Sequence, residues 1–414
     1  MSTVQRSRWL IPAVAALLVV FVAAAYYLVR ARAGDGHRGL HEPVPPGTDT
    51  LTQRETAAMA TASVTHFLDT YVDPDGRVVR RDQGGDTVSE GQAYALLAAV
   101  AVGDRSRFER VWEWTSTHLE RDDALLASHW DEGRIVDSQP AADADLDAAR
   151  ALLLAAERFQ SDRYHDQAAE LAAAILKWET GEVAGQRVLV AGPWAATNSP
   201  FTVNPSYFSP RGFGLLASGL NEPRWSEVRA SSYRLIDGLT DTPPGLPPDW
   251  AQAEPSGEVR PIPAPGSNGR PQYGYDAVRV LIRMAADCQP RGQELAARPW
   301  PFLRDQIDAG LVDVYGLDGE RIGEGPHPVA FVAAAAAAHA AGDRQASADL
   351  LARAEHLDRE RPSYYGAAWV ALGRVILTTD LLDECSAPLV GGKAVELSGS
   401  LWSTDLGASA AMAE

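Results

Sequence analysis

Apolar residues recur at helical spacing almost without interruption over residues 51–381, and this periodicity limits the chain to an all-α fold. No convincing run of strand pairs competes with it. The alanine- and leucine-rich composition, 46% hydrophobic, suits the large core that such a fold buries. The periodicity predicts twelve helices, over residues 52–70, 88–102, 104–120, 143–159, 161–176, 209–219, 222–239, 273–288, 290–309, 327–340, 343–357 and 362–381.

The connections between these helices alternate in length. The segments that lead into even-numbered helices are mostly long and rich in Trp, Tyr, Pro and Gly, whereas most even-numbered helices pass into the next through a few residues. Short connections of this kind join antiparallel neighbours. These short turns lie around residues 103–104, 160–161, 221–222, 289–290, 342–343 and 358–362.

Six such helix hairpins closed into a ring form an (α/α)6 barrel. The even-numbered helices, such as the one that contains residues 331–341, are the more apolar and are expected inside, because a helix buried on several sides needs apolar residues all round. All the long segments then fall on one rim, at the N-termini of the inner helices. An alanine-rich solenoid is the structural alternative, although no fixed repeat period supports it.

Three acidic residues stand at the predicted starts of inner helices: Glu90, Asp143 and Asp276. Each alone could be an acid that the helix dipole favours, and residues 87–90 also have the spacing of a capping box. Gly91 favours a functional role for Glu90, because glycine is unfavourable in a helix and is often kept where another group approaches the backbone. A pair of carboxyl groups that face one cleft is what the hydrolysis of a glycosidic bond requires.

Aromatic residues accompany these acids on the predicted rim. Trp and Tyr faces can stack on sugar rings, although ordinary packing accounts for most of the eleven tryptophans. Arg279 stands three residues after Asp276 on the same helix and could keep that carboxylate ionised. The candidate substrate-binding residues are Trp130, Trp194, Tyr207, Tyr275, Arg279 and Tyr364.

Charge and ligand spacing exclude other classes of function. The net charge of −18 argues against nucleic acid as a partner, because its phosphates would be repelled. The nine histidines show no HExxH or similar spacing, so we predict no metal site and no cofactor. The two cysteines, Cys288 and Cys385, could form a disulfide outside the cell or remain two buried thiols.

The N-terminal region predicts a membrane anchor. Residues 9–29 form an uncharged apolar run of 21 residues with arginines on both sides, which is long enough to span a bilayer. We expect a single-pass signal anchor with the remaining chain outside the cytoplasm; a cleaved signal that ends near Ala33 is the alternative. The predicted regions are a short cytoplasmic N-terminus (1–8), the anchor (9–29), an extended linker (30–50), the barrel (51–383) and a tail (384–414).

Six ordered blocks between residues 50 and 380 resemble glycoside hydrolase family 8. This family of bacterial endoglucanases includes the cellulase encoded with bacterial cellulose synthase. The resemblance implies an (α/α)6 barrel with its cleft at the N-terminal rim of the inner helices. The blocks are SEGQAYALLAAVAVGDRSRFERVWEWTSTHL, DSQPAADADLDAARALLLAAERF, VNPSYFSPRGF, GLPPDW, YGYDAVRVLIRMAADC and PSYYGAAWVALGRV.

The resemblance also implies roles for the three acids. Glu90, in SEGQ, matches the family's general acid, and Asp276, in the Tyr-Asp-Ala block, matches the general base of an inverting mechanism. Asp143 matches the aspartate that binds and distorts the sugar at the point of cleavage. The chain departs from the family next to Asp143, with Ala142 in place of serine or threonine and with Asp147-Ala148 where bulkier residues are usual.

These features together predict a membrane-anchored, extracytoplasmic endo-glycosidase that acts on β-1,4-glucan. It would trim cellulose or a related exopolysaccharide and could work beside the machinery that synthesises this polymer. Related branches cleave mixed-linkage glucan, xylan or chitosan, so these substrates are alternatives. A non-catalytic glycan-binding barrel is another, but the presence of all three acids disfavours it.

Overall fold

The computed structural model describes residues 53–382, in which helices predominate. The helices of this part of the chain are α2 (Gln53–Tyr71), α3 (Ser89–Val102), α4 (Arg105–His118), α5 (Ala142–Phe159), α6 (Asp162–Trp178), α7 (Pro210–Gly219), α8 (Arg224–Leu239), α9 (Ala277–Ala285), α10 (Pro290–Ala297), α11 (Trp300–Asp308), α12 (Pro328–Ala340), α13 (Arg344–Glu360) and α14 (Tyr364–Thr378).

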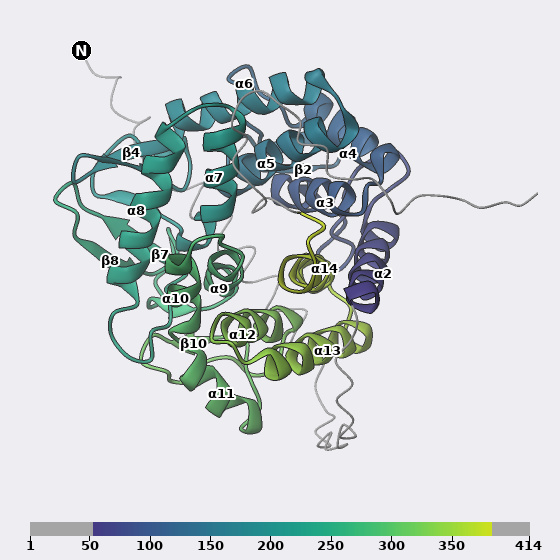
Figure 1. Cartoon of the computed structure of the whole chain (residues 1–414). Coiled ribbons are helices and arrows are strands. Elements are labelled where there is room, and N and C mark those ends of the chain that lie inside the picture. The colour runs from purple at the N-terminus through teal and green to yellow at the C-terminus, as the bar shows by residue number, and fades with distance from the viewer. Residues whose placement is uncertain (1–52, 383–414) are drawn as a thin grey trace, which may run out of the picture.

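These helices form two concentric rings (Figure 1). In the inner ring α3, α5, α7, α9, α12 and α14 each contact the next, and α14 contacts α3 to close the circle. Helices α4, α6, α8, α10 and α13 each follow an inner helix and pack outside it, while α2 covers α14. The predicted (α/α)6 barrel, with the even-numbered helices inside, is therefore confirmed.

Side-chain distribution explains which helices lie inside. In α3 every residue except Glu90 and Val102 is buried, because neighbouring helices and the barrel interior surround it. The alanine-rich α12 is buried in the same way, and its small side chains let other helices approach closely. In α4 the buried residues, such as Phe108, Val111 and Trp112, share one face. Inner helices such as α3 and α12 are thus apolar on nearly all sides, whereas an outer helix such as α4 has one apolar face.

The predicted helix over residues 290–309 is two helices in the structure. Helix α10 ends at Ala297 and α11 begins at Trp300, with Arg298 and Pro299 between them. Proline has no backbone N–H and its ring clashes with the preceding turn, so Pro299 ends the first helix. The prediction of one continuous helix was wrong at this point.

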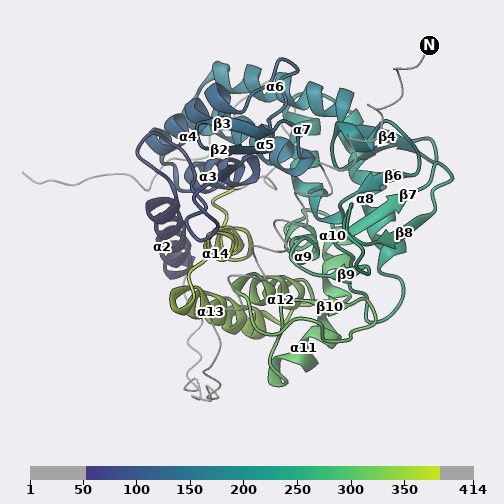
Figure 2. The same ribbon diagram turned by 180° about the vertical axis from the view of Figure 1, so that it is seen from behind.

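The expectation that strand pairs are absent was also wrong. The long segments form small antiparallel sheets, and Figure 2 shows β4 and β6 to β8 gathered beside α8. Their order is β1-β2-β3, β4-β5, β6-β7-β8 and β9-β10. The strands are β1 (Thr87–Val88), β2 (His129–Asp131), β3 (Arg134–Asp137), β4 (Thr180–Val183), β5 (Gln186–Leu189), β6 (Phe201–Val203), β7 (Trp250–Ala253), β8 (Val259–Ile262), β9 (Gln272–Tyr273) and β10 (Tyr315–Gly316).

Several predictions concern residues before Gln53 or after Leu382, which the structure does not describe. No helix over residues 53–382 is long and apolar enough to cross a bilayer. The predicted anchor at 9–29, the linker at 30–50 and the tail at 384–414 lie outside the described residues. Cys385, for which the sequence left open a disulfide with Cys288 or a buried thiol, lies outside them too.

Two buried carboxyl groups make the stability of the barrel depend on pH. Asp145 in α5 and Glu179 after α6 are both fully buried. Burial raises the pKa of both, and the charge of Asp145 raises the pKa of Glu179 further. Such groups ionise first in the unfolded chain, so their contribution to the free energy of unfolding is largest below the unfolded pKa of about 4 and falls as pH rises toward the folded pKa.

We therefore expect Glu179→Gln to reduce this fall in stability above the unfolded pKa of about 4, because it removes one of the two titrating groups. Urea unfolding at several pH values measures the slope. Glu182→Gln, at an exposed position of β4, is the matched control and should follow wild type. A slope that stays unchanged in Glu179→Gln would contradict this account of the pair.

Candidate active site

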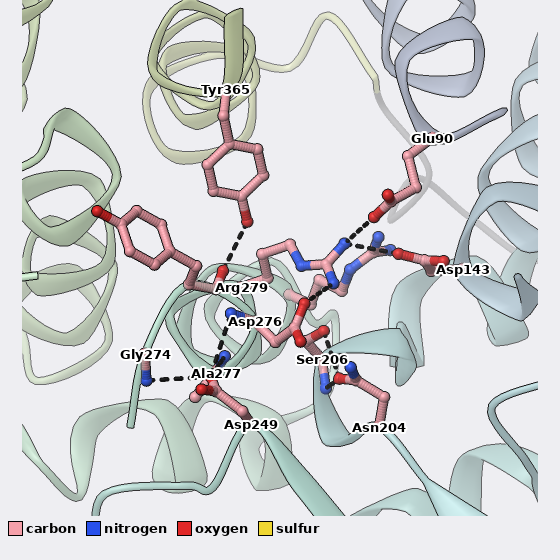
Figure 3. A network of polar contacts seen from close by, with 12 residues as sticks. Glu90, Asp143, Asn204, Ser206, Asp249, Gly274, Asp276, Ala277, Arg279 and Tyr365 are labelled. Atoms are coloured by element: carbon pink, nitrogen blue, oxygen red, sulfur yellow. Dashed lines mark hydrogen bonds and ion pairs between the residues drawn. The ribbon is translucent and has the colours of Figure 1, made fainter. Parts of the chain in front are cut away.

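Glu90 is the second residue of α3 and does not form the capping box that its spacing allows. The N-cap of α3 is Val88, which makes no side-chain cap hydrogen bond. The Thr87 hydroxyl instead donates to the carbonyl of Val78 at 2.7 Å. The capping-box alternative is therefore wrong, and the Glu90 carboxylate, about one third exposed, is directed to the barrel interior (Figure 3).

Gly91 is required by the close approach of a side chain from another inner helix. A Cβ at this position would lie 2.7 Å from the hydroxyl oxygen of Tyr364, the first residue of α14. The side chain of Tyr364 is buried, and within the described part of the chain its hydroxyl has no hydrogen-bond partner. The prediction that Gly91 admits another group next to Glu90 is confirmed.

Arg279 brings the three acids together from three inner helices (Figure 3). Its Nη1 donates to Glu90 Oε1 at 2.9 Å and to Asp143 Oδ2 at 2.6 Å. Its Nη2 donates to Asp276 Oδ1 at 2.6 Å. Glu90 and Asp143 are the second residues of α3 and α5, and Asp276 is the N-cap of α9. The three inner-helix starts therefore meet around one guanidinium that is 1% exposed.

A second ion pair lies one helical turn along the same two helices. Arg283 donates to both carboxylate oxygens of Asp147, at 2.8 and 2.7 Å, and both side chains are buried. Asp147 and Arg283 each follow a member of the Asp143–Arg279 pair by four residues, so the two pairs repeat with the helix. The departure from the family pattern at Asp147 therefore has a structural partner in Arg283.

Burial and the neighbouring charges set the protonation of this cluster. Burial raises the pKa of Asp143 well above its usual range, the Glu90 carboxylate raises it further, and Arg279 opposes both effects. Burial also raises the pKa of Asp276, against the opposing effect of Arg279 and with a further increase from Asp143. Arg279 thus favours the ionised form of Asp276, as predicted, but burial outweighs this effect. The cluster holds a proton more tightly than free carboxyl groups do.

Two of the three predicted tyrosines, Tyr207 and Tyr364, lie near the acids. The ring centroid of Tyr207, which ends the short 3-10 helix η2 (Pro205–Tyr207), lies 5.6 Å from the Arg279 guanidinium carbon. The Tyr275 carbonyl accepts a hydrogen bond from the Tyr365 hydroxyl at 2.7 Å. The Tyr275 hydroxyl donates to Asp313 Oδ2, also at 2.7 Å. Tyr207 and Tyr364 thus lie near the acids, whereas the Tyr275 side chain bonds to Asp313.

The two predicted tryptophans lie in β2 and in a short 3-10 helix. Trp130, in β2, packs edge-on against Trp114 at 5.4 Å and under the Arg77 guanidinium, whose central carbon is 4.3 Å from its ring centroid. Trp194, in the short 3-10 helix η1 (Pro193–Ala195), is 41% exposed. Neither has a direct bond to the acids among the interactions of the described residues, so both stay predicted subsite residues.

Two residues that belong to the cluster, Tyr94 and Asp249, were not predicted from the sequence. The hydroxyl oxygen of Tyr94 accepts from Arg279 Nη1 at 2.9 Å, and Tyr94 follows Glu90 by one helical turn, which could have identified it. Asp249 accepts from the backbone N–H of Asp276 at 3.1 Å. It lies in the GLPPDW block, but the sequence offers no reason to pair it with residues some 27 positions away.

The described side chains point to acid–base chemistry. Over residues 53–382 no three His, Cys, Asp or Glu side chains are grouped so that they could hold a metal ion. The cluster has instead three carboxyl groups around a fixed cation, with aromatic side chains beside them. Such a group can give a proton to one atom and take a proton from another.

Comparisons with known proteins agree with this arrangement. The model described as glycosyl hydrolases family 8 matches residues 51–294. A probable endoglucanase of Novacetimonas hansenii is 32% identical over 227 residues, which cover 52% of this chain and 64% of that protein, less than two thirds of its length. An endoglucanase of Salmonella typhi is 32% identical over 286 residues, which cover 65% of this chain and 74% of that protein.

A solved structure agrees over a larger part of the chain. The endo-beta-1,4-glucanase of Acetobacter xylinum aligns with a TM-score of 0.66 and 25% identity, over 77% of this chain and 98% of that one. The family match spans more than half of the sequence and confirms the resemblance that the six blocks indicate. This chain therefore belongs to glycosyl hydrolase family 8.

Proposed function

We propose that this chain is an endo-acting hydrolase of β-1,4-glucan that inverts the configuration of the sugar. Glu90 is the general acid, Asp276 the general base, and Asp143 binds the sugar at the point of cleavage. The observation that carries the proposal is that Glu90 and Asp276 bond to different nitrogens of the Arg279 guanidinium. The relatives from Novacetimonas hansenii and Salmonella typhi, described as endoglucanases, support the choice of a glucan.

The reaction needs one proton at each side of the bond. A water molecule attacks the anomeric carbon and gives a proton to Asp276 as the glycosidic C–O bond breaks. Glu90 gives its proton to the leaving oxygen, so both products carry hydroxyl groups. Inversion requires the two carboxyl groups to lie ~6.5–9.5 Å apart, with room for the water. A guanidinium between Glu90 and Asp276 supports such a separation, because it prevents their direct contact.

The surroundings of the acids suit a sugar. Asp143 is buried with a raised pKa, so it can share a proton with a sugar hydroxyl. The buried hydroxyl of Tyr364 has no hydrogen-bond partner in the described protein and can bond to a second hydroxyl of the sugar. The face of Tyr207, close to Arg279, is a candidate surface for stacking.

A panel of polymers tests the proposed activity. Full-length protein in mild detergent is incubated with carboxymethylcellulose, lichenan, xylan, chitosan and the host's own exopolysaccharide, and new reducing ends are measured. We expect release from carboxymethylcellulose by wild type and not by Glu90→Gln. Release from xylan or chitosan alone would assign another polymer. Binding to a polymer without release would replace the hydrolase by a glycan-binding barrel.

We also propose that residues 9–29 anchor the enzyme in the cell membrane with the barrel outside the cytoplasm. The apolar run of 21 residues supports this location. An anchored enzyme at this place would act on polymer made by the same cell, beside the machinery that synthesises it. Membrane fractionation tests the anchor: the full chain should stay in the membrane pellet after a high-salt wash, and recovery in the soluble fraction would contradict it.

A further inference from the structure

The proposed base stands at a helix start that it does not cap. Asp276 is the N-cap residue of α9, but its φ of −80° and ψ of −51° are helical, and its side chain makes no cap hydrogen bond. The carboxylate bonds to Arg279 instead. The first backbone N–H groups of α9 therefore need another acceptor.

Asp249 supplies this acceptor (Figure 3). Its Oδ1 accepts from the backbone N–H groups of Gly274 at 3.0 Å, Asp276 at 3.1 Å and Ala277 at 2.8 Å. Its Oδ2 accepts from Gln272 Nε2 at 3.1 Å. One oxygen atom thus holds the backbone on both sides of the base.

Asp249 is itself held in place. It is 8% exposed and directly precedes β7, and its backbone N–H donates to the Gln272 carbonyl at 2.8 Å. Burial, followed by the charge of Asp276, raises the pKa of Asp249 to about 7. Near neutral pH the group is therefore only partly ionised, and a neutral amide of the same shape is a close substitute for it.

Gly274 makes this close packing possible. A Cβ at position 274 would lie 2.6 Å from Asp249 Oδ2 and 3.0 Å from Gln272 Nε2. A larger residue at position 274 would push the carboxylate away from the start of α9. The glycine in the YGYD sequence thus serves the contact between Asp249 and the backbone of the base.

We propose that Asp249 is a positioning residue: by binding three backbone N–H groups at the start of α9, it holds the Asp276 carboxylate where it takes a proton from water. This inference rests on the proposed function, in which Asp276 is the base. Asp249 does not touch the reacting atoms. It acts through the backbone, so its loss should slow the chemical step and leave sugar binding largely intact.

Kinetics with a soluble cello-oligosaccharide separate these effects. Asp249→Ala is expected to lower kcat about 100-fold, because a small displacement of a reacting group costs this much. KM should change by less than about threefold, since the subsites are retained. Asp249→Asn keeps an oxygen that accepts the same three N–H groups, so kcat should stay within about fivefold of wild type. Gly274→Ala should lower kcat in the same direction as Asp249→Ala.

A matched variant controls for the loss of a helix cap as such. Asp104 is the N-cap of the outer helix α4, and its carboxylate accepts from the Arg107 backbone N–H at 3.0 Å. Asp104→Ala should lower the thermal midpoint without changing kcat or KM. Circular dichroism of all variants checks that each one is folded. If Asp249→Ala does not fold, Asp249→Asn tests the inference in its place.

The outcomes separate this inference from the proposed function. A hundredfold loss of kcat in Asp249→Ala that Asp249→Asn largely restores supports it. Near-wild-type kcat in folded Asp249→Ala, or equal losses in the alanine and asparagine variants, would overturn the inference while wild-type hydrolysis upholds the function. Wild-type protein that cleaves no polymer would overturn the proposed function and this inference with it.

Discussion

Glu90→Gln is expected to lower kcat on a β-1,4-glucan on the order of 10³-fold. Glutamine has nearly the same shape, and its amide oxygen can still accept the hydrogen bond that Arg279 donates to Glu90. It cannot give a proton to the leaving oxygen. The loss therefore falls on kcat, and it measures the contribution of general acid catalysis alone.

The leaving group provides the internal check on Glu90. An aryl glycoside whose leaving group is a weak base, such as a 2,4-dinitrophenolate, departs without a proton, so Glu90→Gln should lose much less activity on it. The exposed Glu113→Gln on α4 should match wild type on both substrates. An equal loss on the glucan and on the activated glycoside would show that Glu90 is not the acid.

Asp276→Asn is expected to lower kcat on the order of 10⁴-fold, because the amide cannot take a proton from the attacking water. Arg279 remains bonded to Glu90 and Asp143 in this variant, so the rest of the cluster keeps its partner. The loss should be the same for the glucan and for the activated aryl glycoside. This pattern is opposite to that of Glu90→Gln, since the water must be activated whatever group departs.

The exposed Asp241→Asn, after α8, is the matched control for Asp276→Asn and should keep wild-type rates. Steady-state rates on both substrates measure the two losses. A loss in Asp276→Asn that shrinks with a better leaving group would assign proton donation, not water activation, to Asp276. The roles of the two acids would then have to be exchanged.

The ring of helices could be predicted from the sequence because the burial of a helix determines how apolar residues are distributed along it. The enclosed helices α3 and α12 are apolar on nearly all sides, and the outer helix α4 is apolar on one face only. The break at Pro299 could also have been predicted, but the helical periodicity on both sides of it indicated one continuous helix. The short strands could not be predicted, because β2 and β3 have only three and four residues, too few for an alternating pattern to show.

The candidate site could be predicted only in part. Glu90, Asp143 and Asp276 are recognisable because each stands at a helix start within a family motif. Their common contact with Arg279 joins residues up to 189 positions apart, and no local pattern contains that information. Asp249 was missed for the same reason. A carboxylate that binds a distant helix start looks, in the sequence, like any acid in a loop.

The configuration of the first product tests the central claim most directly. Proton NMR during the cleavage of a cello-oligosaccharide by full-length protein shows which anomer forms before mutarotation mixes the two. Because a β-linkage is cleaved with inversion, we expect the α-anomer to appear first. Initial formation of the β-anomer would contradict the inverting pair of Glu90 and Asp276, and the absence of any cleavage would contradict the proposed hydrolase itself.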